Sequence, residues 1–178
     1  MTLKPFTLIA ALLAAPAFAA GGGSDSPPKP TPTSESCEDG QVWDADSKSC
    51  VTAESSLIDD DTRYDAVREL AYAGRIESAQ IVLAAMSDQQ SDRVLTYWGF
   101  THRKLGDAER AASFYDAALA RNPANHLARS YRAQGWVAEG RVEDARAELG
   151  VIRARGGRNT WAEASLRLAI EQGRGFDY

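Results

Sequence analysis

The chain has 178 residues, and its 20 lysines and arginines against 25 aspartates and glutamates give a formal net charge of −5 at pH 7. This acidic balance argues against general nucleic-acid binding, which draws its affinity from clustered basic side chains placed against phosphate. Beyond the first 19 residues no stretch is long and apolar enough to span a bilayer, so we expect no integral membrane segment in the mature chain.

Residues 1–19 have the pattern of a secretory signal peptide. Lys4 supplies a positive start, residues 6–15 are apolar, and Ala17 and Ala19 place small side chains where signal peptidase needs them. An uncleaved anchor is the alternative, but an apolar run of about ten residues falls short of the roughly 18 that cross a bilayer. We therefore expect cleavage before Ala20 and a periplasmic or secreted protein.

Residues 20–36 are rich in Gly, Ser and Pro and contain almost nothing apolar. Such a segment cannot offset the entropy cost of ordering itself, so it is predicted to be a flexible linker.

Residues 37–51 contain the two cysteines of the chain, Cys37 and Cys50. In an oxidising compartment these are expected to form a local disulfide that closes a small hairpin, with strands around residues 41–43 and 49–51. A metal site here would need two further ligands at close spacing, and none stands there. The segment CEDGQVWDADSKSCV also resembles pieces of small extracellular modules, some of which bind polysaccharide, so carbohydrate or cell-wall binding through this hairpin is an alternative function.

From residue 58 to residue 173 the sequence is alanine-rich and periodic, which predicts helices throughout. A glycine followed five residues later by an alanine recurs at intervals of 32 and 34 residues, which is the length of one helix pair per repeat. The glycine can close the first helix in the left-handed conformation, and the alanine lets the two helices approach closely. The pairs are Gly74 with Ala79, Gly106 with Ala111, and Gly140 with Ala145.

Residues 92–125 resemble the tetratricopeptide repeat in detail. The first helix has large apolar residues at Leu95 and Trp98 and a small one at Gly99, although His102 stands where the family usually has tyrosine. The second helix has the family's small, aromatic, small and terminating residues at Ala111, Tyr115, Ala118 and Pro123.

Looser copies flank this middle repeat. The copy at residues 60–91 offers Val67, Leu70, Ala79, Leu83 and Met86, and the copy at residues 126–157 offers Tyr131, Trp136, Ala145, Leu149 and Ile152, with Ala133 at the crossing. A last stretch places Trp161, Ala164, Leu168 and Ile170 on one side, as a capping helix would.

The resemblance implies an all-α fold: a right-handed α-solenoid of about three tetratricopeptide-like helix pairs plus a C-terminal capping helix, preceded by the flexible tether and the disulfide-closed loop. The expected units are residues 1–19, 20–36, 37–51, 58–173 and a tail at 174–178.

The sequence lacks the residue patterns that catalysis requires. After export the chain has two histidines, two paired cysteines and no glycine-rich phosphate loop, so we expect no enzyme, no cofactor and no metal. His102 is expected to be an interior histidine held by a hydrogen bond. His126 begins a helix and is expected to be solvated. The acidic residues 59–61 are better explained by helix capping than by a cation site.

The family resemblance also implies a concave surface, lined by the first helices, that docks an extended peptide or protein segment. The expected partner is therefore a protein or peptide, with an association with the cell envelope left open. The family's groove pattern carried onto this sequence selects ten residues: Tyr64, Arg68, Tyr72, Arg93, Thr96, Phe100, Arg103, Lys104, Ser130 and Gln134.

Overall fold

A computed structural model describes residues 26–175 of the chain. The predicted signal peptide and the mature terminus at Ala20 lie outside the described residues, as does most of the predicted tail. Within the described range, no helix combines the length and the apolar character that crossing a membrane requires.

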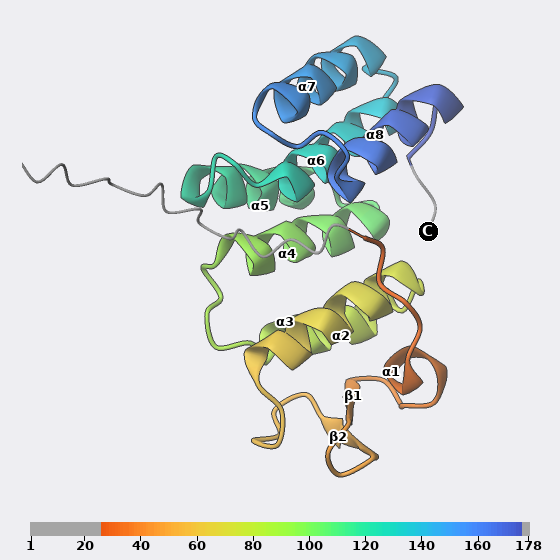
Figure 1. Ribbon diagram of the computed structural model, residues 1–178, viewed down its shortest axis with the longest axis vertical. Coiled ribbons are helices and arrows are strands. Elements are labelled where there is room, and N and C mark those ends of the chain that lie inside the picture. The colour runs from red at the N-terminus through yellow and green to blue at the C-terminus, as the bar shows by residue number, and fades with distance from the viewer. Residues whose placement is uncertain (1–25, 176–178) are drawn as a thin grey trace, which may run out of the picture.

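Seven long helices form the body of the described chain and stack along its longest axis (Figure 1). Neighbouring helices pack in antiparallel pairs, and a seventh helix packs on the last pair. The pairs are α2 (Asp60–Tyr72) with α3 (Ile76–Ala84), α4 (Asp92–Lys104) with α5 (Ala108–Arg121), and α6 (His126–Ala138) with α7 (Val142–Ala154), followed by α8 (Trp161–Gln172). The predicted solenoid of three helix pairs with a capping helix is confirmed.

The turn inside each pair is built as the repeating glycines predict. Gly74, Gly106 and Gly140 have φ angles of 78°, 84° and 79°, a left-handed conformation that suits a residue without a Cβ. In each turn the N–H of the next residue bonds a carbonyl five residues back, for example Asp107 N to His102 O at 2.9 Å. This is the Schellman pattern, which satisfies the last carbonyls of the first helix and turns the chain into the second.

The middle pair also confirms the close crossing of its two helices. A Cβ built on Gly99 would lie 2.6 Å from the ring of Tyr115, so only glycine lets this ring sit against α4. Ala111 and Ala118 are buried on the same side of α5. Helix α5 ends at Arg121, just before Pro123, which cannot continue a helix.

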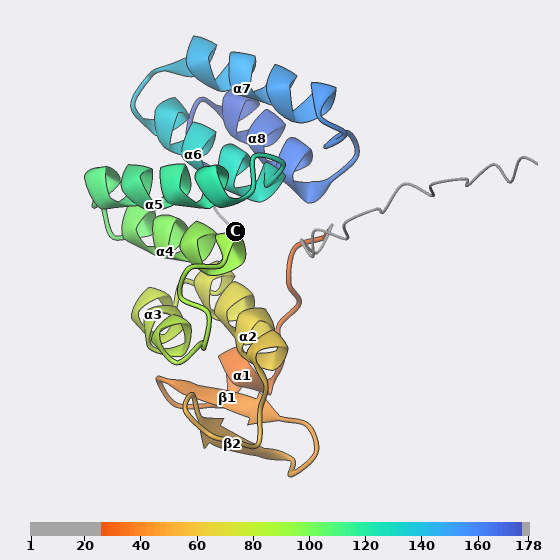
Figure 2. The same ribbon diagram turned by 90° about the vertical axis from the view of Figure 1, so that its left-hand side faces the viewer.

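The N-terminal end is covered by a small non-helical unit (Figure 2). Strands β1 (Gln41–Asp44) and β2 (Ser49–Thr52) pair in antiparallel register, and Cys37 and Cys50 form the predicted disulfide. Val42 and Ala53 belong to the same buried cluster as the first two helix pairs. Hydrogen bonds that fix the unit to the array include those from Gly40 N to Ser78 Oγ and from Arg63 Nε to Ala53 O. The hairpin is therefore a cap on the end of the solenoid.

The linker predicted for residues 20–36 differs in its last residues, because Pro32–Glu35 form a one-turn helix, α1, that packs on α2. The reason is a buried carboxylate: Glu69 accepts hydrogen bonds from Thr31 N at 2.7 Å, Thr31 Oγ1 at 2.7 Å and Ser34 N at 2.9 Å. Composition alone did not indicate this partner, which lies more than thirty residues away.

Helix α8 covers the opposite end, where it packs on both α6 and α7. Its buried face consists of Ala162, Ser165, Leu166, Ala169 and Ile170. The predicted stripe was wrong in register, since Trp161, Ala164 and Leu168 are only half-buried and Ile170 alone is shared. The physical reason is that α8 lies between two helices, so its contact face is rotated from the simple apolar stripe.

Candidate binding surface

All ten residues selected from the sequence lie on α2, α4 and α6, the first helices of the three pairs. These helices follow one another in space, since α2 packs against α4 and α4 against α6. We call the side formed by these ten residues the inner surface.

The inner surface is more enclosed than an open groove. Six of the ten residues are buried and the remaining four are half-buried. The buried ones are Tyr64, Arg68, Thr96, Phe100, Ser130 and Gln134. Their role in binding stays a prediction, but the half-buried residues Tyr72, Arg93, Arg103 and Lys104 are the ones that a partner can reach first.

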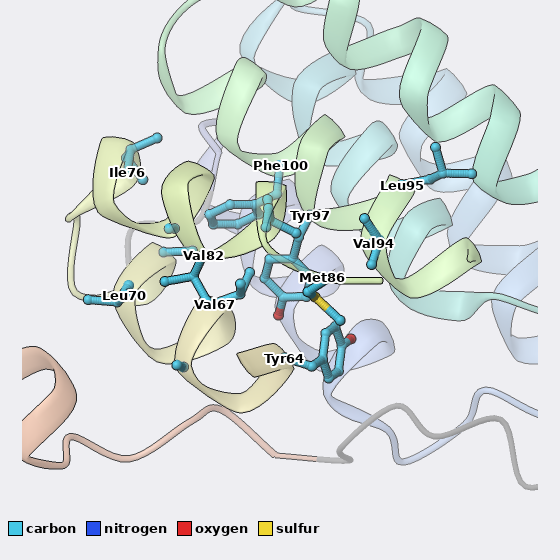
Figure 3. Packing of buried hydrophobic residues seen from close by; sticks show 14 of the residues in the cluster. Tyr64, Val67, Leu70, Ile76, Val82, Met86, Val94, Leu95, Tyr97 and Phe100 are labelled. Atoms are coloured by element: carbon cyan, nitrogen blue, oxygen red, sulfur yellow. The ribbon is translucent and has the colours of Figure 1, made fainter. Parts of the chain in front are cut away.

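Aromatic rings fill the middle of the inner surface. Tyr97, which sequence reasoning did not select, makes edge-to-face contacts with Tyr64 and Tyr131 at centroid distances of 5.6 and 6.0 Å. Phe100 packs on Tyr131 at 4.8 Å, and Figure 3 shows Tyr64, Tyr97 and Phe100 among the apolar side chains of the first two pairs. Burial raises the pKa of the Tyr64 and Tyr97 hydroxyls, so both stay neutral and serve as hydrogen-bonding groups.

A chain of hydrogen bonds ties the two ends of the array across this surface. The hydroxyl of Tyr72 on α2 lies 2.5 Å from the hydroxyl of Tyr131 on α6. It also lies 2.6 Å from Nε1 of Trp161, which donates to it from the start of α8. The sequence predicts Trp161 on the apolar side of the capping helix. Its indole N–H instead joins residues 89 positions apart in the sequence.

The last two selected residues face α8. Ser130 Oγ and Ser165 Oγ are 3.1 Å apart, and Gln134 Nε2 donates to Ser165 Oγ at 3.3 Å. The chain after α8 also returns to this side, because a Cβ on Gly175 would lie 3.4 Å from Arg103 Nη1. The α6 part of the inner surface is thus already covered by the C-terminal helix and the residues that follow it.

Acidic side chains balance part of the positive charge. Arg68 Nη1 lies 3.3 Å from Asp65 Oδ1, and Arg93 Nη1 lies 2.6 Å from Asp61 Oδ1. The ten selected residues include no acid, so these partners were missed. Asp65 lies three residues before Arg68 on the same helix, whereas Asp61 reaches Arg93 from a different helix, a contact that helical periodicity does not indicate.

Three of the four cations of the inner surface lie over aromatic rings. The Arg103 guanidinium and the Lys104 ammonium are 5.3 and 5.8 Å from the centroid of Phe100, and the Arg93 guanidinium is 5.0 Å from that of Tyr64. Such stacking holds a cation in place by the electrostatic attraction of the ring face. The arrangement presents positive charge beside apolar rings.

Asp59, His102 and His126, which the sequence analysis also considered, contact neighbouring parts of the helical array. Asp59 caps α2 by accepting from Thr62 N at 2.8 Å, as predicted. His102 is half-buried and stacks on Phe114, with its Nδ1 3.7 Å from Asp107 Oδ2. His126 begins α6 but is half-buried, and burial lowers its pKa, so the expected solvation is only partial. In the described part of the chain, no group of three or more His, Cys, Asp and Glu side chains could hold a metal ion.

Trp98 and Trp136 are half-buried against neighbouring side chains. Trp98 stacks on Phe114 at 6.0 Å, and its Nε1 donates to Gln89 Oε1. Trp136 lies between the guanidinium groups of Arg132 and Arg141, each 5.0 Å from its ring. Packing rather than a ligand cage accounts for both.

Sequence comparison agrees with this geometry. A model of the tetratricopeptide repeat family matches residues 102–170, which run from the end of α4 into α8. A search of the curated proteins and a search of the solved structures each found no match. The family match covers less than half of the chain and supports tetratricopeptide repeats in that part; the family consists in general of non-enzymatic interaction scaffolds.

Proposed function

We propose that this chain is a non-enzymatic scaffold that acts outside the cytoplasm and holds an extended peptide or protein segment on its inner surface. The observation that carries the proposal is the tetratricopeptide match over residues 102–170, because such repeats generally present the faces of their first helices to protein partners. The signal-peptide pattern at residues 1–19 and the Cys37–Cys50 disulfide support action in an oxidising compartment.

The chemistry of the accessible residues favours a partner with carboxylates. Arg93, Arg103 and Lys104 are half-buried, and each is stacked on an aromatic ring of the inner surface. Cations held in this way form charge-assisted hydrogen bonds with carboxylates, while the half-buried ring of Tyr72 offers apolar contact to the chain between them. The hairpin at residues 37–51 is used as a cap on α2 and α3, so we do not propose polysaccharide recognition by it.

Site-specific crosslinking tests the proposal. A photoreactive phenylalanine analogue placed at Arg93 or at Lys104 should capture a partner in the exporting cell, because both positions are half-buried on the inner surface. The same analogue at Arg146, exposed on α7, is the matched control. Capture from Arg146 alone would move the binding site to the outer helices.

A charge reversal provides the complementary test. The double variant Arg93→Glu with Lys104→Glu should abolish capture while the melting temperature stays near that of the unmodified chain. Arg68 is unsuitable for such a test because it is buried, and a glutamate there would place an unpaired carboxylate in the interior. Undiminished capture by the folded double variant would rule the inner surface out.

A further inference from the structure

A proline-rich segment of the chain itself already lies on the inner surface. Residues 26–31, SPPKPT, run from α1 beside α2 towards α4, as the two views of the ribbon show (Figures 1 and 2). Arg68 Nη2 donates to the carbonyl of Ser26 at 2.9 Å, and Glu69 accepts from Thr31 N at 2.7 Å. Two neighbouring residues of α2 therefore hold the two ends of one extended segment.

This segment differs from the chain that follows it. Residues 32–39 are fixed by the buried side chain of Thr33, by the disulfide at Cys37, and by Arg75, whose guanidinium donates to Thr33 O, Cys37 O and Asp39 Oδ1. In residues 26–30, by contrast, four side chains are exposed and only Pro28 is half-buried. Little apolar contact is lost when residues 26–30 leave α2. These residues can therefore be displaced while α1 and the hairpin stay in place.

The contacts that Arg68 and Glu69 make with residues 26–31 recognise the main chain and an extended conformation. Arg68 is one of the ten inner-surface residues, it is buried, and it reaches a backbone carbonyl, which any residue can offer. Three prolines in six residues favour the extended polyproline conformation, so the segment loses little conformational entropy when it binds. Glu69 adds a preference for an N–H and a hydroxyl at the end of the segment, both supplied here by Thr31.

We infer that residues 26–31 are a built-in ligand of the inner surface, and that this surface takes in their place an extended, proline-containing segment of a partner protein. The inference rests on the proposed function and specifies the chemical class of the partner. A tethered segment has an effective concentration of the order of millimolar. A competing segment can bind only to chains in which residues 26–31 have left α2. Its apparent affinity is therefore the intrinsic affinity multiplied by the fraction of such open chains.

A peptide supplied in trans tests the inference. The probe is a fluorescein-labelled peptide of residues 22–31, GGSDSPPKPT, and fluorescence anisotropy measures its binding to the purified chain. The variant Pro27→Gly, Pro28→Gly, Pro30→Gly and Thr31→Ala loosens the built-in segment but keeps Arg68, Glu69 and Thr33. It should bind the probe at least about tenfold more tightly than the unmodified chain.

Two controls separate binding on α2 from unspecific association. Adding Arg68→Met to the loosened variant should remove most of the gain, with circular dichroism as the check on its fold. If that chain does not fold, a probe with valine in place of Thr31 gives the same information, because it lacks the hydroxyl that bonds Glu69. A probe in which glycines replace the three prolines should bind more weakly than the original.

Equal affinity of the unmodified and loosened chains for the probe, or no binding by either, would overturn the inference. Crosslinking of a partner from Arg93 and Lys104 does not depend on this probe. Capture there without probe binding would sink only this inference, whereas loss of capture there would sink the proposed function.

Discussion

The two ends of the helical array are closed by different means. At the C-terminal end α8 repeats the element that precedes it, another amphipathic helix that buries Leu166 and Ile170 in the core of the last pair. At the N-terminal end a disulfide-closed hairpin and a single helical turn cover α2 and α3, held by Glu69 and Arg75. An exposed apolar end face must be covered in any solenoid. The comparison shows that a helix does so with apolar area, whereas a unit too small for its own core does so with a covalent bond and hydrogen bonds to charged side chains.

The C-terminal cap should show the largest effect of a single substitution. Leu166 is fully buried between α8 and its neighbours, so Leu166→Ala should lower the free energy of unfolding by about 2–5 kcal/mol through lost apolar burial and the cavity left behind. Urea titration followed by circular dichroism measures the change. Arg167→Ala, on the exposed side of the same helix, is the control. Similar small effects for both would mean that α8 is only loosely attached.

The N-terminal cap should depend on its disulfide. Replacing Cys37 and Cys50 with serine should lower the free energy of unfolding by up to about 3 kcal/mol, because the unfolded chain regains the freedom of the closed loop. The melting temperature should therefore fall, since Val42 and Ala53 share a core with the first two pairs. Helix content at 25 °C should stay nearly constant, because the disulfide encloses no part of α2–α8. Loss of the helical signal at 25 °C would show that the array cannot form without the hairpin.

A pH titration gives the smallest effect and tests the polar contacts at the C-terminal end. Glu163 Oε1 lies 2.8 Å from Arg153 Nη2, and this hydrogen bond holds the pKa of Glu163 below its ordinary value of 4.5. The stabilising contribution is therefore fully present above pH 4.5 and disappears as the pH falls through the lower folded-state value. Glu163→Gln should be less stable than the unmodified chain at pH 7, with the gap closing towards pH 3. A gap that does not change with pH would contradict this role, and Glu143→Gln, exposed on α7, is the control.

Sequence reasoning succeeded where the signal was periodic. The recurring Gly74, Gly106 and Gly140 located the turns, and Gly99 with Tyr115 located a helix crossing, because such features depend on residues close together in one repeat. It failed where a contact joins distant segments. Glu69 binds residues around Thr31, and Trp161 reaches Tyr72, and neither partner leaves a pattern in the local sequence.

The same limit explains the candidate site. The ten selected residues do lie on the three first helices, because repeat periodicity determines which helix face they share. Their burial could not be predicted from the repeat. It comes from Tyr97 between the helices, from α8 packed on Ser130, and from the extended segment at residues 26–31, whose Ser26 carbonyl bonds Arg68. These are the parts of the chain that depart from the repeat.

Hydrogen exchange of the chain alone and with its crosslink-identified partner tests the binding claim most directly. Binding on the inner surface should slow exchange in α2 and α4, with the largest change around residues 93–104 and near Arg68. The outer helices α5 and α7 should be unchanged. Slowed exchange confined to α5, α7 or the hairpin at residues 37–51, with α2 and α4 unaffected, would contradict the account.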